Sequence, residues 1–392
     1  MDTLKRFADE KLIALTKSNL RRTLHPTGRL PPSLAERGGR KLISFACNDY
    51  LGLSQHARVK EAAVRAIGRY GAGAGASRLV TGNNPLYQEL EATLARIKGT
   101  EAALVFGSGY LANIGIIPTL IGEPDLIVGD ESMHSCMHAG ARLSGAKTVL
   151  FDHNDVADCR ARLKAHRAAH PKCLVMTEGV FSMDGDRAPV KALARLAEEF
   201  DAWFMTDDAH ALGVIGDGRG SAFADEGADD FKADVPLQMG TLSKAAGAYG
   251  GYLCASAPVI DLIANRARSL FYSTALPPAV LASATEALKM IEDDKDLVAK
   301  PLAKARLFTQ RMGLEAAQSA IVPMIVGDPQ KALYAAGALE DEGFLVIAIR
   351  PPTVPEGTSR LRFTFSAAHA DGDIERLAEA LRRIGPRIGI RG

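Results

Sequence analysis

The chain has 392 residues, with 47 lysines and arginines against 46 aspartates and glutamates, so its formal net charge is +1. A general nucleic-acid-binding protein usually has a basic excess, and this balance therefore argues against that class. The five cysteines are scattered and form no CxxC pair, which excludes a zinc ribbon and a disulfide scaffold and fits a reducing compartment.

The N-terminal segment lacks the apolar core of a signal peptide. The longest apolar stretch, at residues 111–121, is interrupted by Asn113 and Pro118. It is also shorter than the ~20 residues that a membrane-spanning helix needs. We therefore expect a soluble, cytoplasmic protein.

The first part of the chain predicts a helix and a connector. In residues 1 to about 25, apolar side chains recur at near-helical spacing and indicate an amphipathic helix: Leu4, Phe7, Leu12 and Leu15. A proline-rich connector follows at 25–33, and a short strand is expected at 41–46.

From residue 55 onward, helical patterns alternate with short apolar runs. The expected helices are 56–70, 85–98, 156–170, 190–200 and 277–293. The expected strands are 102–106, 126–128, 148–151, 173–177, 202–206, 237–239 and 251–254. This alternation predicts an α/β fold with a mainly parallel sheet covered on both faces.

The last part of the chain predicts a smaller α+β unit. Strands are expected at 321–326, 344–348 and 360–366, with a final helix at 373–384. We therefore divide the chain into an N-terminal helix and connector, a large domain and a small C-terminal domain: 1–50, 51–280 and 281–392.

The strongest local signal for chemistry is the segment GTLSKAAG at 240–247, where Lys244 follows an expected strand. Its small neighbours leave room for a bulky ligand, and Thr241 and Ser243 supply donors suited to a phosphate. A partly desolvated lysine has a lowered pKa and can form an imine with an aldehyde. On its own, this segment leaves a pyridoxal-phosphate lysine and an ordinary solvated lysine equally open.

A second signal is the run Asp207-Asp208-Ala209-His210, just after the expected strand at 202–206. Carboxylates at this end of a strand face the crevice where ligands of α/β sheets bind. A pyridoxal ring needs an acid partner for its nitrogen, because the protonated ring is the electron sink. Asp207 suits that role, and His210 could bond the phenolic oxygen or face the ring. A helix N-cap with a satisfied histidine is the alternative.

A third signal is the segment FGSGY at 106–110, between an expected strand and a helix. Backbone amides at a helix N-terminus favour a phosphate, and Ser108 or Tyr110 could add a contact. An ordinary strand-to-helix turn is the alternative for this segment.

Two further patterns compete with this interpretation. GAGAGA at 71–76 formally fits a dinucleotide-binding loop, but that loop requires a preceding strand and the residues before it predict a helix. His134 and His138 have a spacing that could suit a metal on a helix, yet no third ligand stands nearby. A flexible substrate loop and a histidine stacked on an aromatic ring are the preferred interpretations.

Taken together, the motifs resemble the α-oxoamine synthases, a pyridoxal-phosphate family of the aspartate-aminotransferase fold (fold type I), and the resemblance covers nearly the whole chain. The matching segments are NDYLGL at 48–53, the glycine-rich loop ending in ASR at 76–78, TEGVFSMDG at 177–185, DDAH at 207–210 and TLSK at 241–244. Ala76 departs from the pattern, since many relatives have glycine there, which leaves the shape of the loop open.

The resemblance implies a role for each position that matches a cofactor-binding residue. Lys244 binds the aldehyde covalently, Asp207 pairs with the ring nitrogen, and His210 bonds the phenolic oxygen. These three residues and His134, which stacks over the ring, form the catalytic set. The further implied cofactor contacts are Ser182, Thr241, Ser108 and the amides of Gly109 and Tyr110.

The resemblance also implies partners and substrate contacts. Ser273 and Thr274 reach the phosphate of the other subunit's cofactor, which implies a homodimer. Arg362 holds the carboxylate of the amino acid. The remaining implied substrate contacts are Arg21 and Thr353, which touch the acyl substrate, and Asn48.

Three segments narrow the implied activity: YSTALPP at 272–278, AIRPPTVP at 348–355 and GTSRLR at 357–362. They most resemble members that join L-alanine to a pimeloyl thioester, with loss of carbon dioxide, in biotin synthesis. The acyl donor can be coenzyme A or a carrier protein. A sister enzyme that uses glycine or serine is the alternative within the family; a Rossmann dehydrogenase and a colourless interaction module are alternatives from other classes.

Overall fold

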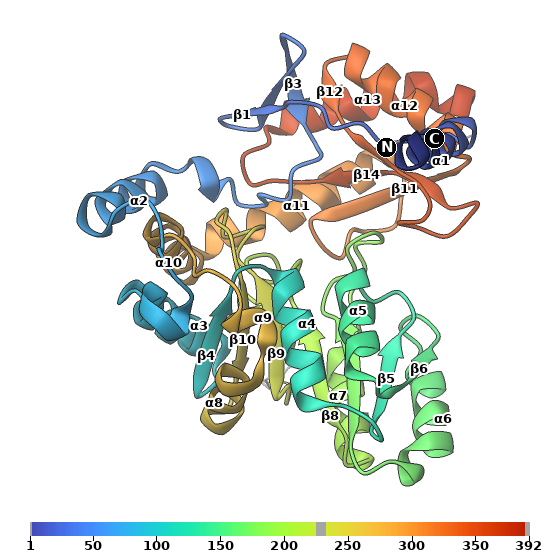
Figure 1. Cartoon of the computed structure of the whole chain (residues 1–392). Coiled ribbons are helices and arrows are strands. Elements are labelled where there is room, and N and C mark those ends of the chain that lie inside the picture. Colours follow the sequence, from blue (N-terminus) through green and yellow to red (C-terminus); the bar gives the residue numbers. More distant parts are fainter. Residues whose placement is uncertain (1, 225–232, 389–392) are drawn as a thin grey trace. The chain divides into compact units, whose positions relative to one another are not determined.

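A seven-stranded sheet is the central element of the computed structural model, which describes residues 2–224 and 233–388 (Figure 1). The strands are β4 (Ala102–Phe106), β5 (Leu126–Asp130), β6 (Lys147–Phe151), β7 (Cys173–Glu178), β8 (Trp203–Asp207), β9 (Leu237–Thr241) and β10 (Gly251–Ala255). Their order in the sheet is β4-β10-β9-β8-β7-β5-β6. Each strand lies within one or two residues of its predicted position.

The prediction of a mainly parallel sheet is confirmed, with one exception. Strand β10 is antiparallel to both of its neighbours, β4 and β9, whereas the pairs from β9 to β6 are parallel. Only residues 242–250 connect β9 to β10. Because a parallel crossover needs a dozen or more residues, this short connection makes the strand return antiparallel.

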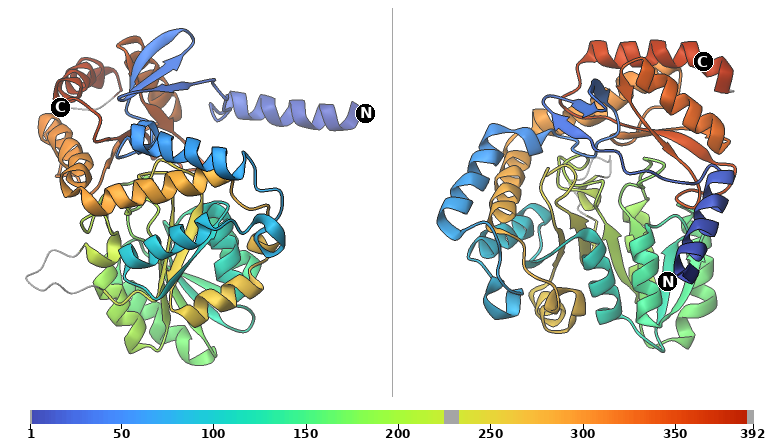
Figure 2. Two further views of the ribbon diagram at one scale, coloured as in Figure 1. Left: turned by 90° about the vertical axis from the view of Figure 1, so that its left-hand side faces the viewer. Right: turned by 45° about the horizontal axis from the view of Figure 1, so that its top comes forward.

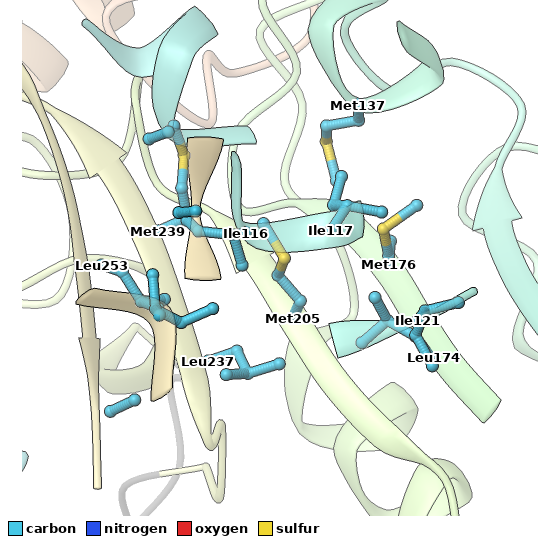
Figure 3. Close-up of a cluster of buried hydrophobic side chains, with 14 of the residues drawn as sticks. Ile116, Ile117, Ile121, Met137, Leu174, Met176, Met205, Leu237, Met239 and Leu253 are labelled. Atoms are coloured by element: carbon cyan, nitrogen blue, oxygen red, sulfur yellow. The ribbon is translucent and has the colours of Figure 1, made fainter. Parts of the chain in front are cut away.

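Helices cover both faces of the sheet. One face packs against α4 (Gly109–Leu120), α5 (Ser135–Ser144), α8 (Ala257–Arg266) and α9 (Arg268–Phe271), and the other packs against α6 (Val156–His166) and α7 (Val190–Glu199). Figure 3 shows Ile116 and Ile117 of α4 among the methionines of the strands, such as Met205. Each such side chain contributes about 1.5–3 kcal/mol when it is buried.

Three more helices lie in the same part of the chain as the large sheet: α2 (Ala57–Tyr70), α3 (Leu86–Lys98) and α10 (Pro278–Asp293). Helix α2 lies alongside α10 (Figure 2). All three agree with the predicted helices to within one residue. The positions of these three helices and of the strands of the large sheet were therefore predictable from apolar periodicity, since each buried face repeats at the period of its own element. The helix expected at 156–170 ends earlier, at His166.

The chain forms two compact units, one of residues Asn48–Leu302 and one that joins Met1–Cys47 to Ala303–Gly392. The second unit has a four-stranded sheet, β1 (Gly28–Leu30), β2 (Leu34–Arg37), β3 (Arg40–Ser44) and β12 (Phe344–Leu345). It also has a three-stranded sheet, β11 (Ile321–Gly327), β14 (Ser359–Thr364) and β13 (Ile347–Ile349). Its further helices are α1 (Asp2–Lys17), α12 (Pro329–Asp341) and α13 (Asp371–Ile388), and α11 (Lys295–Met312) leads into it.

This grouping differs from the three-part division expected from the sequence. Strand β3 pairs with β12 in parallel, so an N-terminal strand and a C-terminal strand share one sheet. A pairing between strands some 300 residues apart leaves no mark in the local pattern of either strand.

Two predictions near the N-terminus were wrong in extent. The first helix ends at Lys17 rather than near residue 25, because Asn19 adopts a left-handed φ of 55° and Leu20 N donates to Leu15 O at 2.8 Å. The connector at 25–33 also contains a strand, β1, which forms a hairpin with β2. In the part of the chain that the structure describes, no helix has both the length and the apolar character that crossing a membrane requires.

Candidate active site

The predicted cofactor residues of the larger unit gather where the central strands end. Residues Phe106, Thr241 and Gly251 lie side by side across β4, β10 and β9, so the end of β4, the end of β9 and the start of β10 coincide. Glu178 and Asp207 are paired at the ends of β7 and β8. The sheet thus brings segments from five strands to one edge, as the crevice rule predicts.

The start of α4 approaches Thr241 closely. Ser108 is the N-cap of α4, and its Oγ accepts a hydrogen bond from Leu111 N at 3.2 Å. A Cβ added at Gly109 would lie 3.4 Å from the Cβ of Thr241, and one added at Gly251 would collide with the carbonyl oxygen of Ser108. The absence of side chains at these glycines lets the start of α4 pack directly against β9 and β10, beside Thr241. The first amides of a helix have no partner within the helix and can meet an anion.

Asp207 is held by two hydrogen bonds inside the larger unit. Its side chain is only 4% exposed. Oδ2 accepts from Asn113 Nδ2 at 2.8 Å, and Oδ1 accepts from Ala209 N at 3.0 Å. The carboxylate is therefore oriented and desolvated, and such a group can stabilise a nearby positive charge.

Lys244 lies at the end of a chain of polar contacts. Its Nζ is 2.7 Å from His210 Nε2, and His210 Nδ1 is 2.6 Å from the Tyr50 hydroxyl. The Tyr50 hydroxyl donates to Asn48 Oδ1 at 3.3 Å. Because the Tyr50 hydroxyl donates its one proton to Asn48, it accepts from His210 Nδ1, and Nε2 of the neutral ring is the acceptor that faces Lys244. The sequence analysis assigned His210 to the phenolic oxygen of the cofactor; its ring lies beside Lys244 Nζ, and that role stays a prediction.

Glu178 is a second buried carboxyl at the same edge. It is 2% exposed and accepts a hydrogen bond from the backbone amide of Ser182. Burial raises the pKa of Glu178 well above its ordinary value; Asp207 raises it further, while Lys244 and the Ser182 amide oppose the rise. Two neighbouring carboxyls rarely both ionise, so we assign the proton to Glu178 and the charge to Asp207.

His153 links the loop that carries Ser182 to strand β5 through two acidic partners. His153 Nδ1 is 3.1 Å from Asp130 Oδ1, and its Nε2 is 2.8 Å from Asp186 Oδ2. Burial lowers the pKa of His153, but the bonds to Asp130 and Asp186 outweigh it and raise the pKa to about 10. The side chain of Ser182 is itself buried.

His134 caps the start of α5 with its ring. Its Nδ1 accepts from Cys136 N at 3.2 Å and lies 2.8 Å from Cys136 Sγ. Desolvation lowers the pKa of His134, and the charges of Lys244 and His138 lower it further, whereas Asp207 raises it. The influence of Asp207 and Lys244 places His134 in the same site. Among residues 2–224 and 233–388, no group of three or more His, Cys, Asp or Glu side chains could hold a metal ion.

The glycine-rich loop meets the segment that carries the predicted intersubunit residues. Ser77 forms a β-bridge with Thr274, and Ala275 N donates to Ala76 O at 3.0 Å. Helix α2, not a strand, precedes Gly71, so the dinucleotide-binding alternative lacks the strand that it requires. Tyr110 and Thr274 are exposed, and Ser273 is half-buried.

Three predicted substrate contacts belong to the smaller unit. Arg362 lies on β14 and is buried. Thr353 Oγ1 accepts a hydrogen bond from Arg22 Nη2 at 2.9 Å, whereas the predicted contact Arg21 is exposed. Arg350 donates to the carbonyl oxygen of Asn19. Residues 19–22 and the segment around Thr353 therefore form one basic surface, and the substrate roles stay predictions.

The site analysis from the sequence missed four side chains that the structure brings together: Tyr50, Asn113, Cys136 and Glu178. One of them left a signal, because Asn113 is a polar residue inside an otherwise apolar stretch. Tyr50 and Glu178 stand within segments that carry the family resemblance, but only the folded structure gives them partners.

The comparisons with known proteins agree with this geometry. Residues 40–381 match the family model described as aminotransferase class I and II. A protein of Methylocella silvestris named 8-amino-7-oxononanoate synthase is 63% identical, with 89% of this chain and 98% of the relative covered. One of the same name from Beijerinckia indica is 56% identical, with 98% and 99% covered.

A solved structure gives the same result for the fold. Serine palmitoyltransferase from S. paucimobilis, a variant with a bound PLP–myriocin aldimine, superposes with a TM-score of 0.92 at 29% identity. The match covers 99% of this chain and 100% of that chain. This chain therefore belongs to the aminotransferase class I and II family and, within it, to the α-oxoamine synthases, the pyridoxal-phosphate-dependent acyltransferases of the aspartate-aminotransferase fold.

Proposed function

We propose that this chain condenses L-alanine with a pimeloyl thioester and releases carbon dioxide, the activity named by its relatives of 56–63% identity, 8-amino-7-oxononanoate synthase. The observation that carries the proposal is the joint position of Lys244 and Asp207. A lysine amine bonded to His210 and a buried, oriented carboxylate act on the same edge of one sheet.

The side chains of the larger unit fit pyridoxal phosphate in three respects. The N-terminus of α4 at Gly109 lies beside Thr241, and such a helix start suits a phosphate. Asp207 offers a buried carboxylate for a protonated ring nitrogen. Lys244 offers an amine for an aldehyde. A cofactor with a phosphate, a basic ring nitrogen and an aldehyde matches this set of groups.

Bound pyridoxal phosphate supplies an aldehyde that captures amines and a protonated ring that draws electrons away from the amino acid's α-carbon. Asp207 keeps the ring nitrogen protonated, and Asn113 and Ala209 N hold its carboxylate in place. Lys244, released when the amino acid binds, takes the α-proton onto Nζ. His210 Nε2 accepts a hydrogen bond from that amine, which directs the lone pair of Nζ away from the imidazole.

The remaining predicted contacts concern the two substrates and the second subunit of a homodimer. Arg362 holds the alanine carboxylate, and Asn48 adds a further substrate contact. Thr353, with Arg21 and its neighbour Arg22, lies on a basic surface suited to an anionic acyl thioester on coenzyme A or on a carrier protein. Ser273 and Thr274 act across a homodimer. The five free thiols suit a cytoplasmic location.

The test is an assay with purified protein, pyridoxal phosphate, L-alanine and pimeloyl-coenzyme A or pimeloyl-carrier protein, with the product identified by mass. Glycine and serine replace alanine in parallel reactions, and acetyl-coenzyme A replaces the pimeloyl donor. We expect 8-amino-7-oxononanoate from alanine with a pimeloyl donor. Product only from glycine and acetyl-coenzyme A would assign the chain to a sister activity, and no product from any pair would reject the proposal.

A further inference from the structure

A line of three polar contacts links Asp207 to His134 through the interior of the larger unit. Asn113 Nδ2 donates to Asp207 Oδ2 at 2.8 Å and to Cys136 Sγ at 3.0 Å. Cys136 Sγ lies 2.8 Å from His134 Nδ1. Asn113 and Cys136 are buried, so these contacts are shielded from competition by bulk water.

The direction of each hydrogen bond follows from the number of protons available. An amide nitrogen has two hydrogens, and Asn113 directs them to Asp207 and to Cys136 Sγ. The sulfur therefore accepts from Asn113, and its own proton is free to be donated to His134 Nδ1. Cys136 N also donates to Nδ1, at 3.2 Å. A ring nitrogen that accepts from two donors cannot have a hydrogen, so the ring proton is on Nε2.

We propose that Cys136 is a positioning residue that holds His134 as a neutral imidazole with its proton on Nε2, and that it couples this ring to the carboxylate of Asp207 through Asn113. The inference rests on the proposed function, in which Asp207 faces the ring nitrogen of pyridoxal phosphate and His134 lies over the ring. An imidazolium at that position would repel the protonated cofactor ring and would compete with it for the charge of Asp207.

The surrounding charges are consistent with this assignment. Desolvation lowers the pKa of His134 and the charges of Lys244 and His138 add to this effect, while Asp207 alone opposes it. Burial raises the pKa of the Cys136 thiol to about 12; Asp207 and Glu178 raise it too, against the Asn113 bond and Lys244. The thiol therefore keeps its proton at neutral pH and stays a donor.

Cys159 is a buried cysteine of this fold that packs only within an apolar cluster, and it can be compared with Cys136. It is fully buried in the apolar cluster on the opposite face of the sheet, between α6 and the strands. Burial also raises its pKa to about 12. Its neighbours in that cluster are apolar, whereas Cys136 has an amide on one side and an imidazole on the other. Cys159 is thus the matched control.

The experiment measures the ring-nitrogen NMR shifts of His134 in the full-length protein labelled with ¹⁵N-histidine. The chain has nine histidines, and His134→Gln identifies the signal. The protein is titrated with acid before and after pyridoxal phosphate is added. In the unsubstituted protein and in Cys159→Ala, we expect the Nε2–H form. Cys136→Ala should mix the two tautomers and raise the pKa of His134 by about one unit, a roughly tenfold larger imidazolium fraction.

Cys136→Ser supplies a hydroxyl donor and should restore the Nε2–H form. If Cys136→Ala does not fold, Cys136→Val, which fills the volume without a donor, gives the same comparison. A proton on Nδ1 in the unsubstituted protein, or an unchanged tautomer and pKa in the alanine or valine variant, would overturn the inference.

The two measurements separate this inference from the proposed function. The shifts recorded before the cofactor is added test Cys136 alone. Ring shifts of His134 that do not respond to added pyridoxal phosphate would argue against the proposed function, even if the tautomer depends on Cys136 as expected.

Discussion

Asp207 and Asp208 are neighbours in the chain, but their carboxylates have different partners. Asp207 Oδ2 accepts from Asn113 at 2.8 Å, whereas Asp208 Oδ2 lies 2.5 Å from Lys98 Nζ, with both side chains of that pair fully buried. Ser221 donates to Asp208 through its backbone amide at 3.1 Å and through its hydroxyl. The first aspartate therefore belongs to the candidate active site, and the second belongs to the interior ion pair that fastens α3.

Replacement of each aspartate by asparagine separates these two roles. Asp208→Asn leaves Lys98 buried without a counter-charge, so we expect the free energy of unfolding to fall by about 3–5 kcal/mol. Asp207→Asn loses one of the two oxygens that accept from Asn113 and Ala209 N, so we expect a smaller fall of about 1–3 kcal/mol. It should exchange the α-proton of alanine for deuterium at least ~10²-fold more slowly. The reverse pattern, with Asp208→Asn inactive but stable, would contradict the assignment.

Removal of the Lys244 amine should remove the cofactor attachment. Lys244→Ala is expected to lose the absorbance at roughly 420 nm that an imine of pyridoxal phosphate gives, and to show no reduced adduct after borohydride treatment. Lys289→Ala removes a lysine that is paired with Glu89 at 2.7 Å, away from the site, and is the control. A borohydride adduct on a residue other than 244 would refute the lysine assignment.

The Tyr50 hydroxyl should contribute to turnover more than to stability. Tyr50→Phe keeps the buried ring and removes the contact of 2.6 Å with His210 Nδ1, which fixes the ring that contacts Lys244. We expect kcat to fall about tenfold, equal to about 1.4 kcal/mol, with a small change in stability. Tyr252→Phe is the matched control, because its buried hydroxyl has no hydrogen-bond partner among the described residues. Equal kcat values for the two variants would argue against a role for Tyr50.

Glu178 should behave as a neutral acid near pH 7. Because burial raises the pKa of Glu178, this carboxyl keeps its proton in the folded state at a pH where the unfolded chain has lost it. The free energy of unfolding therefore falls as the pH rises above about 4.5. Glu178→Gln keeps the shape without the titration. In urea unfolding, we expect the two proteins to be similar at pH 5 and the variant to be more stable at pH 8. A variant several kcal/mol less stable at pH 8 would show that Glu178 is ionised and paired.

His369 should make the smaller unit sensitive to acid. Its ring stacks on Phe45 with centroids 4.1 Å apart, and its Nε2 lies 3.0 Å from Ser44 O. Burial lowers the pKa of His369 from 6.5 to about 4, so the folded state resists protonation. The free energy of unfolding is therefore at its full value above about pH 6.5 and falls as the pH drops towards 4. Protonation of His369 accounts for about 3 kcal/mol of this fall.

The comparison for this prediction is His369→Gln, which should show a flatter dependence of the unfolding free energy on pH between 4 and about 6.5. His25→Gln, at an exposed histidine, should leave the dependence unchanged. If all three proteins give parallel curves, the acid sensitivity has another origin.

The sequence by itself determined the positions of the strands of the large sheet and the type of chemistry. Strand β4 has the predicted bounds, and the other strands of the large sheet differ by one or two residues, because apolar periodicity is a local property of each segment. Lys244 and Asp207 were also candidates from their own neighbours in the chain, and the resemblance of several motifs to one family implied their roles. A lysine among small residues after a strand, and an aspartate at a strand end, each carry their signal within a few positions.

Only the tertiary structure decided the contacts between distant segments and the protonation of the groups that they bury. Tyr50 and His210 are 160 positions apart, and Asn113 and Asp207 are 94 apart, so no local pattern links them. The proton on Glu178 depends on its burial beside Asp207, which the register of β7 and β8 sets. Burial and register arise from packing of the whole chain, and they fix which carboxyl is charged and which ring nitrogen accepts.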